Sequence, residues 1–231
     1  MKRNFFVDIS HTKRVGFWIE NGFEVLKREG VIALFKKIFK RFYFWILGVD
    51  FAPESLQKYD IENIKSASVC NHILDKSFDE IIERLKNFDL NITEGIFLDY
   101  GSGKGFTLYK ASKAGFKEAV GVEFVEKFCK ISQKNLEKLS IKNAKVINID
   151  AIDFIPFYDT RVIFFHNPFD ERVFEKVLDN LQKADFKKSP LIVYHYPLCE
   201  NVFEKRSNFI LLEKFVSPTS KEKSNFYRLI R

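Results

Sequence analysis

Three glycines alternate with other residues in the segment FLDYGSGKGF, at Gly101, Gly103 and Gly105. The segment follows a short apolar run and precedes a stretch with helical spacing. Glycine allows a tight turn and lets the backbone approach a ligand, and the first N–H groups of a helix can receive its polar atoms. The pattern therefore predicts a ligand-binding turn between a strand and a helix. A turn of purely structural purpose would leave the same pattern.

Acidic residues stand at the ends of the neighbouring apolar runs. Asp99 precedes the glycine-rich turn, and Glu123 closes the next run, VGVEF. An acid at the end of a second strand can accept two hydrogen bonds from ribose hydroxyls, although an ordinary strand-end carboxylate is the alternative. Asp150 and Ala151 close a third run, where an adenine ring would lie. A helix or turn cap is the other explanation for Asp150.

Two later runs end in residues that could handle an acceptor. His166-Asn167-Pro168-Phe169 ends one run, and His195 and Tyr196 end the next, IVYHYP. Open α/β sheets bind substrates at the carboxyl ends of their strands. His166, His195 and Asp170 are therefore candidate bases, with Asn167 the first choice to face the reaction, His166 the second and His195 the third. The alternatives are a proline that only sets the strand exit and a structural histidine.

The elements that must position these residues alternate from residue 96 onward. Strands followed by helices predict a parallel sheet covered on both faces. We expect an α/β fold with a Rossmann-like, seven-stranded, mostly parallel sheet, a C-terminal antiparallel strand pair and N-terminal helices. The predicted strands are 96–100, 119–123, 145–149, 162–166, 191–194, 209–215 and 225–230, and the predicted helices are 76–88, 104–114, 126–139 and 171–184. We divide the chain into an N-terminal helical cap, 1–75, and a catalytic domain, 76–231.

Most of the net charge of +7 belongs to the N-terminal segment. Residues 1–50 hold ten Lys and Arg against five Asp and Glu, a net charge of +5. One or two helices are expected over 16–47, interrupted near Gly30. The stretch Val31–Val49 is apolar but carries a central basic cluster, so it is not expected to span a membrane. It predicts either a helix that packs its aromatics on the domain or a basic, aromatic helix that makes peripheral contact with an anionic membrane or partner.

Three separated cysteines, Cys70, Cys129 and Cys199, form no close metal-ligand pair, so we expect no metal. The N-terminus lacks the apolar region of a secretory signal, and a reducing, cytoplasmic location is expected.

The motifs LDYGSGKG, VGVE, NIDA and FFHNPF, in this order, resemble those of class I S-adenosylmethionine (SAM)-dependent methyltransferases. The resemblance covers roughly residues 60–231. Within this superfamily the chain is similar to small bacterial methyltransferases, mostly of unassigned substrate, which share the Asn-Pro-Phe element and an upstream segment like LGVDF. The spacing G-x-G-x-G favours SAM over NAD, whose fingerprint is G-x-G-x-x-G, and Lys104 does not complete a phosphate-binding loop.

The resemblance implies a role for each matching position. The SAM site would consist of Asp99, Gly101, Ser102, Gly103, Gly105, Glu123, Phe124, Asp150, Ala151 and Asn167. The acceptor would lie near Pro168, Phe169, Tyr196 and Tyr59. The single proline after Asn167 departs from the Asn-Pro-Pro-aromatic element of amine methyltransferases, so the acceptor atom stays open between nitrogen and oxygen.

We therefore predict methyl transfer from SAM, which leaves S-adenosylhomocysteine, to a small molecule or glycan-pathway intermediate. One alternative is methylation of a protein lysine or a nucleic acid. Only the basic N-terminal segment supports it, and we recognise no added module for nucleic acid in the sequence. Another is a non-catalytic module that binds SAM or a nucleotide.

Overall fold

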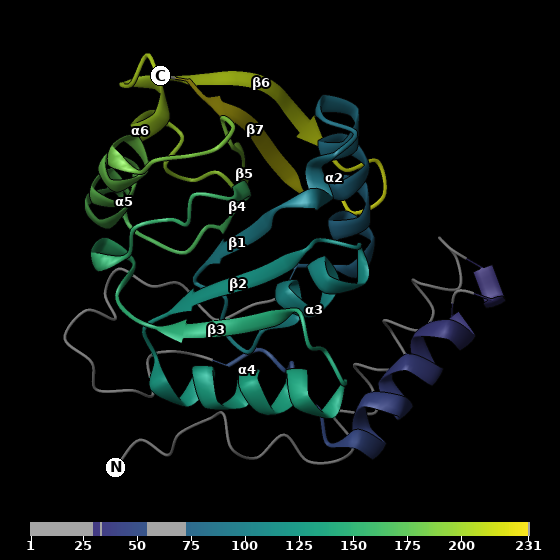
Figure 1. Cartoon of the computed structure of the whole chain (residues 1–231). Coiled ribbons are helices and arrows are strands. Elements are labelled where there is room, and N and C mark those ends of the chain that lie inside the picture. Colours follow the sequence, from purple (N-terminus) through teal and green to yellow (C-terminus); the bar gives the residue numbers. More distant parts are fainter. Residues whose placement is uncertain (1–29, 33, 55–72, 231) are drawn as a thin grey trace, which may run out of the picture. The chain divides into compact units, whose positions relative to one another are not determined.

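The computed structural model of the chain describes residues 30–32, 34–54 and 73–230 (Figure 1). The chain divides into two compact units, Met1–Val49 and Asp50–Arg231. The cap and catalytic domain that we predict at 1–75 and 76–231 stay a prediction. Of the helices expected over 16–47, residues 30–32 and 34–47 are helical, and residues 16–29 lie outside the described part. In the described ranges, no helix has the length and apolarity that crossing a membrane requires.

The second unit is built around one seven-stranded sheet with the order β3-β2-β1-β4-β5-β7-β6. Strands β1 to β5 are parallel, and β7 runs antiparallel to both β5 and β6. This confirms the predicted α/β, Rossmann-like fold with its closing antiparallel pair. The strand bounds are β1 Ile96–Tyr100, β2 Glu118–Glu123, β3 Ala144–Asn148, β4 Thr160–His166, β5 Leu191–His195, β6 Phe209–Val216 and β7 Lys223–Leu229.

Helices cover both faces of this sheet (Figure 1). Buried residues of α2, α3 and α4 pack with one face, and those of α5 and α6 pack with the other. The helix bounds are α2 Asp75–Phe88, α3 Phe106–Lys113, α4 Glu126–Lys138, α5 Glu171–Lys183 and α6 Asn201–Glu204, with short 3-10 turns η3 Ile92–Glu94 and η4 Ala151–Asp153. The sheet is therefore the middle of three layers.

The central strands are apolar at nearly every position because both of their faces are covered. Phe97 and Phe164 contribute to the cluster under α2 and α3, whereas Leu98 and Phe165 contribute to the cluster under α5. Successive side chains of a strand point to opposite faces, which explains this division. Continuous apolar runs of this kind are typical of parallel strands buried on both sides.

The sheet order changes direction between β1 and β4, which are neighbours although far apart in sequence. Tyr100, the last residue of β1, pairs with Val122 on one side and Phe165 on the other. In the next pair, His166 of β4 lies opposite His195 of β5. The loops that leave β1, β2, β4 and β5 therefore meet at one edge, at the switch point where open α/β sheets bind ligands.

Candidate functional site

The glycine-rich turn leaves β1 through three left-handed residues. The φ angles of Gly101, Gly103 and Gly105 are 78°, 53° and 83°. The N–H groups of Gly101 and Ser102 both donate to the Val122 carbonyl of β2, over 2.8 and 3.2 Å. Residues with a Cβ rarely adopt these backbone angles, so the alternating glycines allow the chain to turn sharply into α3.

Glu123 holds this turn from the end of β2. Its Oε2 accepts a hydrogen bond from the Gly103 N–H and its Oε1 one from the Val125 N–H, both over 2.9 Å. The side chain is buried, and burial raises the pKa of the carboxyl group, while the backbone donors oppose this shift. Each carboxylate oxygen can accept a further hydrogen bond, so the two backbone contacts leave capacity for a ligand.

Asp99 is a second buried carboxylate beside the same turn. Its Oδ2 accepts a hydrogen bond from the Thr107 hydroxyl of α3, and its Oδ1 has no partner within the described part of the chain. Burial raises the pKa of Asp99 to about 7, opposed by the Thr107 hydrogen bond and reinforced by the negative charge of Glu123. A buried acceptor without a donor is uncommon in proteins, which makes Oδ1 a natural partner for an amino group of a ligand.

The ends of β2 and β3 are joined through Asn148. Its side-chain amide donates to the carbonyls of Glu123 and Phe124, each over 3.0 Å. Asp150 caps η4 by accepting a hydrogen bond from the Ile152 N–H over 3.1 Å. Asp150 therefore acts as the cap of this short turn, as one of the two explanations predicted. Ala151, the first residue of η4, is buried.

The segment after β4 lies against the glycine-rich turn. A Cβ placed on Gly101 would lie only 2.8 Å from Pro168 Cβ, so the two segments touch. Asn167 adopts a left-handed φ of 42°, and its Oδ1 accepts a hydrogen bond from the Tyr194 hydroxyl over 3.3 Å. Phe169 packs edge-on against Tyr100 and Phe165 of the core. This geometry gives Pro168 and Phe169 a packing role at the site's edge.

His195 is fully buried at the end of β5. Its Nδ1 lies 2.8 Å from Ser224 Oγ, and its Nε2 lies 3.7 Å from Glu222 Oε2. Burial lowers the pKa of His195 to about 4, so the ring is neutral at pH 7. This environment favours a structural role for His195 over contact with an acceptor.

Tyr196 and His166 form the more accessible part of this edge. Tyr196 is 43% exposed, has a φ of 53°, and donates its hydroxyl to Glu222 Oε1 over 3.1 Å. The His166 ring stacks on Tyr196 with centroids 5.7 Å apart and lies 4.8 Å from the His195 ring. Of the predicted acceptor residues, Tyr59 lies outside the described residues.

Lys104 forms ion pairs with the segment of residues 50–54. Its ammonium group lies 2.8 Å from Asp50 Oδ2 and 3.1 Å from Glu54 Oε2, and its side chain is only 6% exposed. The Asn135 amide bridges the carbonyls of Asp50 and Lys104, over 2.7 and 3.0 Å. Phe51 packs against Phe106 of α3. Residues 50–54 are therefore fixed to the helix that begins at the glycine-rich turn.

Sequence reasoning missed Thr107, Asn148, Tyr194 and Glu222, which hold the predicted residues in place. A threonine in the otherwise apolar first turn of α3 was the one local signal available.

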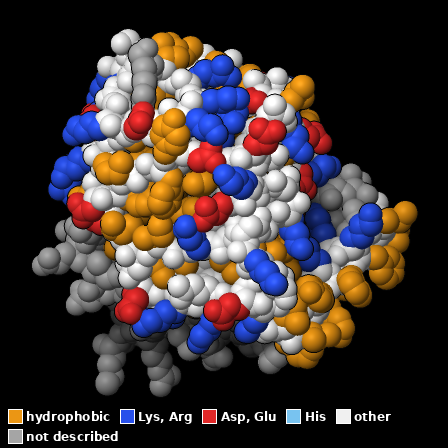
Figure 2. Space-filling view, in the orientation of Figure 1, with side chains coloured by type: hydrophobic (Ala, Val, Ile, Leu, Met, Phe, Trp, Pro, Cys, Tyr) orange, Lys and Arg blue, Asp and Glu red, His pale blue; other side chains and the backbone are white. Residues whose placement is uncertain are grey.

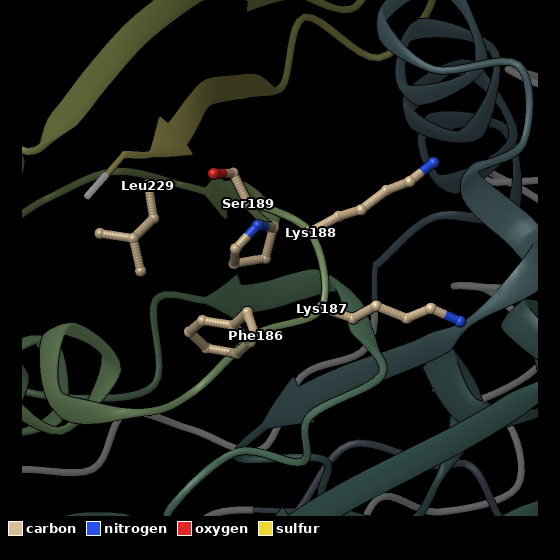
Figure 3. A pocket seen from close by; sticks show the side chains of 6 residues that line it. Phe186, Lys187, Lys188, Ser189 and Leu229 are labelled. Atoms are coloured by element: carbon tan, nitrogen blue, oxygen red, sulfur yellow. The ribbon is translucent and has the colours of Figure 1, made fainter.

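A surface hollow lined by Phe186, Lys187, Lys188, Ser189, Pro190 and Leu229 lies away from this site (Figure 3). It borders the start of β5, at the sheet edge opposite the glycine-rich turn. Among the described residues, no cluster of three or more His, Cys, Asp or Glu could hold a metal ion.

The sequence matches the model of a family described as a methyltransferase domain, over residues 91–227. No curated protein matches it.

Several solved structures share the fold. A SAM-dependent O-methyltransferase from Thermotoga maritima aligns with a TM-score of 0.53 and 16% identity, over 70% of this chain and 67% of that one. Magnesium protoporphyrin IX methyltransferase from Synechocystis, solved with bound SAM, gives a TM-score of 0.52 and 14% identity, over 68% and 79%. A tRNA (m1A58) methyltransferase from Aquifex aeolicus gives 0.52 and 20%, over 69% and 70%.

Proposed function

Because this chain belongs to the methyltransferase domain family, we propose that the edge around Asp99 and Glu123 binds its methyl donor. The chain is a SAM-dependent methyltransferase, and SAM is its cofactor. When bound, SAM supplies a methyl group already activated on a sulfonium, and S-adenosylhomocysteine remains after transfer. The protein's own task is to hold the donor, align the acceptor and exclude water.

The observation that carries the cofactor assignment is the pair of buried carboxylates that flank one glycine-rich turn. Asp99 Oδ1 would accept hydrogen bonds from the amino group of the methionine moiety, and Glu123 would accept those of the ribose hydroxyls. Both carboxylates are at most 6% exposed, and Gly103 N–H already ties Glu123 to the turn. The turn residues would line the methionine moiety, and the residues after β2 and β3 would contact the adenine: Gly101, Ser102, Gly103 and Gly105 for the first, Phe124, Asp150 and Ala151 for the second.

The acceptor side is proposed to consist of Asn167, His166 and Tyr196. Tyr194 fixes the Asn167 side chain, so that Asn167 can orient an acceptor next to the turn. His166 is the candidate base for a hydroxyl acceptor, whereas an amine acceptor requires only a neutral lone pair. A small molecule or an intermediate of a glycan pathway, methylated on nitrogen or oxygen, is the substrate class we propose.

A macromolecular acceptor is the second candidate, supported by the charge of +5 in residues 1–50. A module that binds SAM without turnover is the third.

Calorimetry with SAM and S-adenosylhomocysteine tests the cofactor site. We expect both to bind in a one-to-one ratio. If neither binds, the proposed site is wrong. Turnover is then measured with labelled SAM on panels of small amines and hydroxyl compounds, peptides and RNA. Binding without turnover on every panel would favour the non-catalytic module, and turnover on peptides or RNA alone would favour the second candidate.

Asn167→Ala tests the acceptor side. We expect turnover to fall about 100-fold, because the acceptor loses its orientation, while SAM affinity stays within about twofold. Loss of SAM binding in this variant would instead place Asn167 in the cofactor site.

A further inference from the structure

The helix formed by residues 30–32 and 34–47 exposes its apolar side chains. Ile32, Phe39 and Trp45 are 74%, 72% and 74% exposed. The exposed apolar residues recur at intervals of three and four, which places them on one continuous face: Val31, Phe35, Ile38, Phe42, Ile46 and the three just named. Figure 2 shows apolar side chains gathered along this helix. A single continuous apolar face of this extent usually marks an interaction surface.

Basic residues border this apolar face. Lys36 lies along one edge and Arg41 along the other, with Lys37 and Lys40 on the side away from the apolar residues. Residues 30–47 contain four basic residues and no acidic residue. The apolar face therefore has positive charge on both flanks, which complements a surface that is apolar inside and negatively charged outside.

The end of the helix also suits an interface. Gly48, with a φ of 62°, ends the helix through a hydrogen bond from its N–H to the Trp45 carbonyl over 3.0 Å. Trp45 stacks on Phe42 with ring centroids 5.9 Å apart. Tryptophan and tyrosine concentrate at the boundary between hydrocarbon and headgroups. Tyr43 is also exposed and lies at the edge of the apolar face, on the flank that carries Lys36. Four charges within the helix are incompatible with spanning the bilayer.

We propose that this helix docks the protein on an anionic lipid surface, lying in the plane of the interface. Phe35, Phe39 and Trp45 enter the acyl boundary, while Lys36 and Arg41 contact the phosphates of the headgroups. The apolar area provides affinity, and the basic flanks select anionic over neutral lipid. The inference rests on the helix alone and does not require the proposed acceptor.

Vesicle flotation with the full chain tests the proposal. We expect binding to vesicles of phosphatidylcholine containing phosphatidylglycerol, and roughly tenfold weaker binding to phosphatidylcholine alone. Raising the salt concentration should weaken the anionic preference, because salt screens exposed charges. The chain has two tryptophans, so a Trp18→Phe background leaves Trp45 as the sole reporter. Its emission should shift to shorter wavelength when anionic vesicles are added.

Matched variants separate the two contributions. Phe39→Ser combined with Trp45→Ser should lower the affinity for anionic vesicles at least about tenfold. Leu90→Ser is the apolar control, since Leu90 is 86% exposed after α2. Lys36→Glu with Arg41→Glu should abolish the preference for anionic lipid, whereas Lys187→Glu with Lys188→Glu, the same change in net charge on an exposed loop, should preserve it. SAM affinity, measured for every variant, reports that the second unit is folded.

Three results would overturn the proposal. One is the absence of binding to either vesicle, which would mean that the helix packs on protein. Another is equal loss of binding in the control variants. The third is a dimer in gel filtration that dissociates in the Phe39 and Trp45 variant, which would make a second copy of the chain the occupant of the apolar face.

Discussion

Glu123 holds the glycine-rich turn through a hydrogen bond from the Gly103 N–H, and we propose that the same carboxylate receives the ribose. Glu123→Ala should weaken SAM binding by about 1.5–3 kcal/mol, the range for hydrogen bonds to a charged group. Calorimetry measures the change. Glu123→Gln should weaken SAM binding by less than Glu123→Ala does, because the amide oxygen can still accept one backbone hydrogen bond.

An acid three residues further on provides the control. The side chain of Glu126 is 69% exposed, and it forms an ion pair with Lys130 on the surface of α4. Glu126→Ala should leave SAM affinity unchanged, because exposed ion pairs contribute little. If Glu123→Ala also bound SAM normally, the ribose would have to be held elsewhere.

Asp99 should give SAM binding at the proposed site a pH dependence. Its pKa is raised to about 7, and an ammonium group of SAM would bind the ionised form. Affinity for SAM should therefore rise about tenfold per pH unit below pH 7 and level off above it, because binding releases one proton. Asp99→Asn should bind SAM weakly and lose this slope. A slope that persists in Asp99→Asn would assign the titration to another group.

The positions of the candidate site residues could be predicted from the sequence better than the contacts that hold them in place. Gly101, Glu123 and Asp150 stand at the ends of strands, and strand ends are visible as breaks in apolar runs. The partners of Lys104 were not visible, because Asp50 and Glu54 lie about fifty residues upstream and no local pattern links them. The burial of His195 also depends on Ser224 and Glu222, which β7 brings back to this edge.

The predicted strands agree with the structure to within one or two residues at each end, and β7 begins at Lys223, two residues before its predicted start. Buried parallel strands leave short apolar runs bounded by turn residues, and this signal is local. The four-residue helix α6 was missed because it is too short to show helical periodicity. The predicted helix at 104–114 begins only at Phe106, since Gly105 adopts a left-handed φ as its N-terminal cap.

The start of α3 depends on a close approach at Gly105. A Cβ there would lie 2.2 Å from Ser132 Oγ and 3.2 Å from Ser132 Cβ of α4, and φ is 83°. Gly105→Ala should lower the free energy of unfolding by about 2–4 kcal/mol, through strain and overpacking together. Gly115→Ala is the matched control, because its φ is 93° but nothing lies within 4 Å of the added Cβ. Gly115→Ala should lower the free energy of unfolding by only about 1–2 kcal/mol. Urea unfolding measures both changes. If the two variants lost the same free energy of unfolding, the Ser132 side chain would have moved to relieve the contact.

For the molecule as a whole, the buried ionisable groups at the carboxyl edge oppose one another as the pH changes. The pKa of Asp99 is raised, so the folded state binds more protons than the unfolded chain between about pH 4 and pH 7, and stability from this group falls as pH rises. The pKa of His195 is lowered to about 4, so the unfolded chain binds more protons between pH 6.5 and pH 4. Stability from His195 therefore falls as pH decreases. The two buried groups compensate each other over much of the same range.

Replacing His195 and Asp99 one at a time separates their contributions to the stability of the second unit. His195→Asn should be less stable than the wild type at pH 7, because packing against Phe164 is lost, but the difference should shrink as the pH falls from 6.5 toward 4. The neutral, buried histidine accounts for up to about 3 kcal/mol over this interval. Asp99→Asn should behave in the opposite way and gain relative stability as the pH rises. Urea unfolding at constant ionic strength measures both slopes. Parallel pH profiles for the wild type and His195→Asn would mean that this ring is protonated in the folded state at the same pH as in the unfolded chain, and that burial alone does not control its charge.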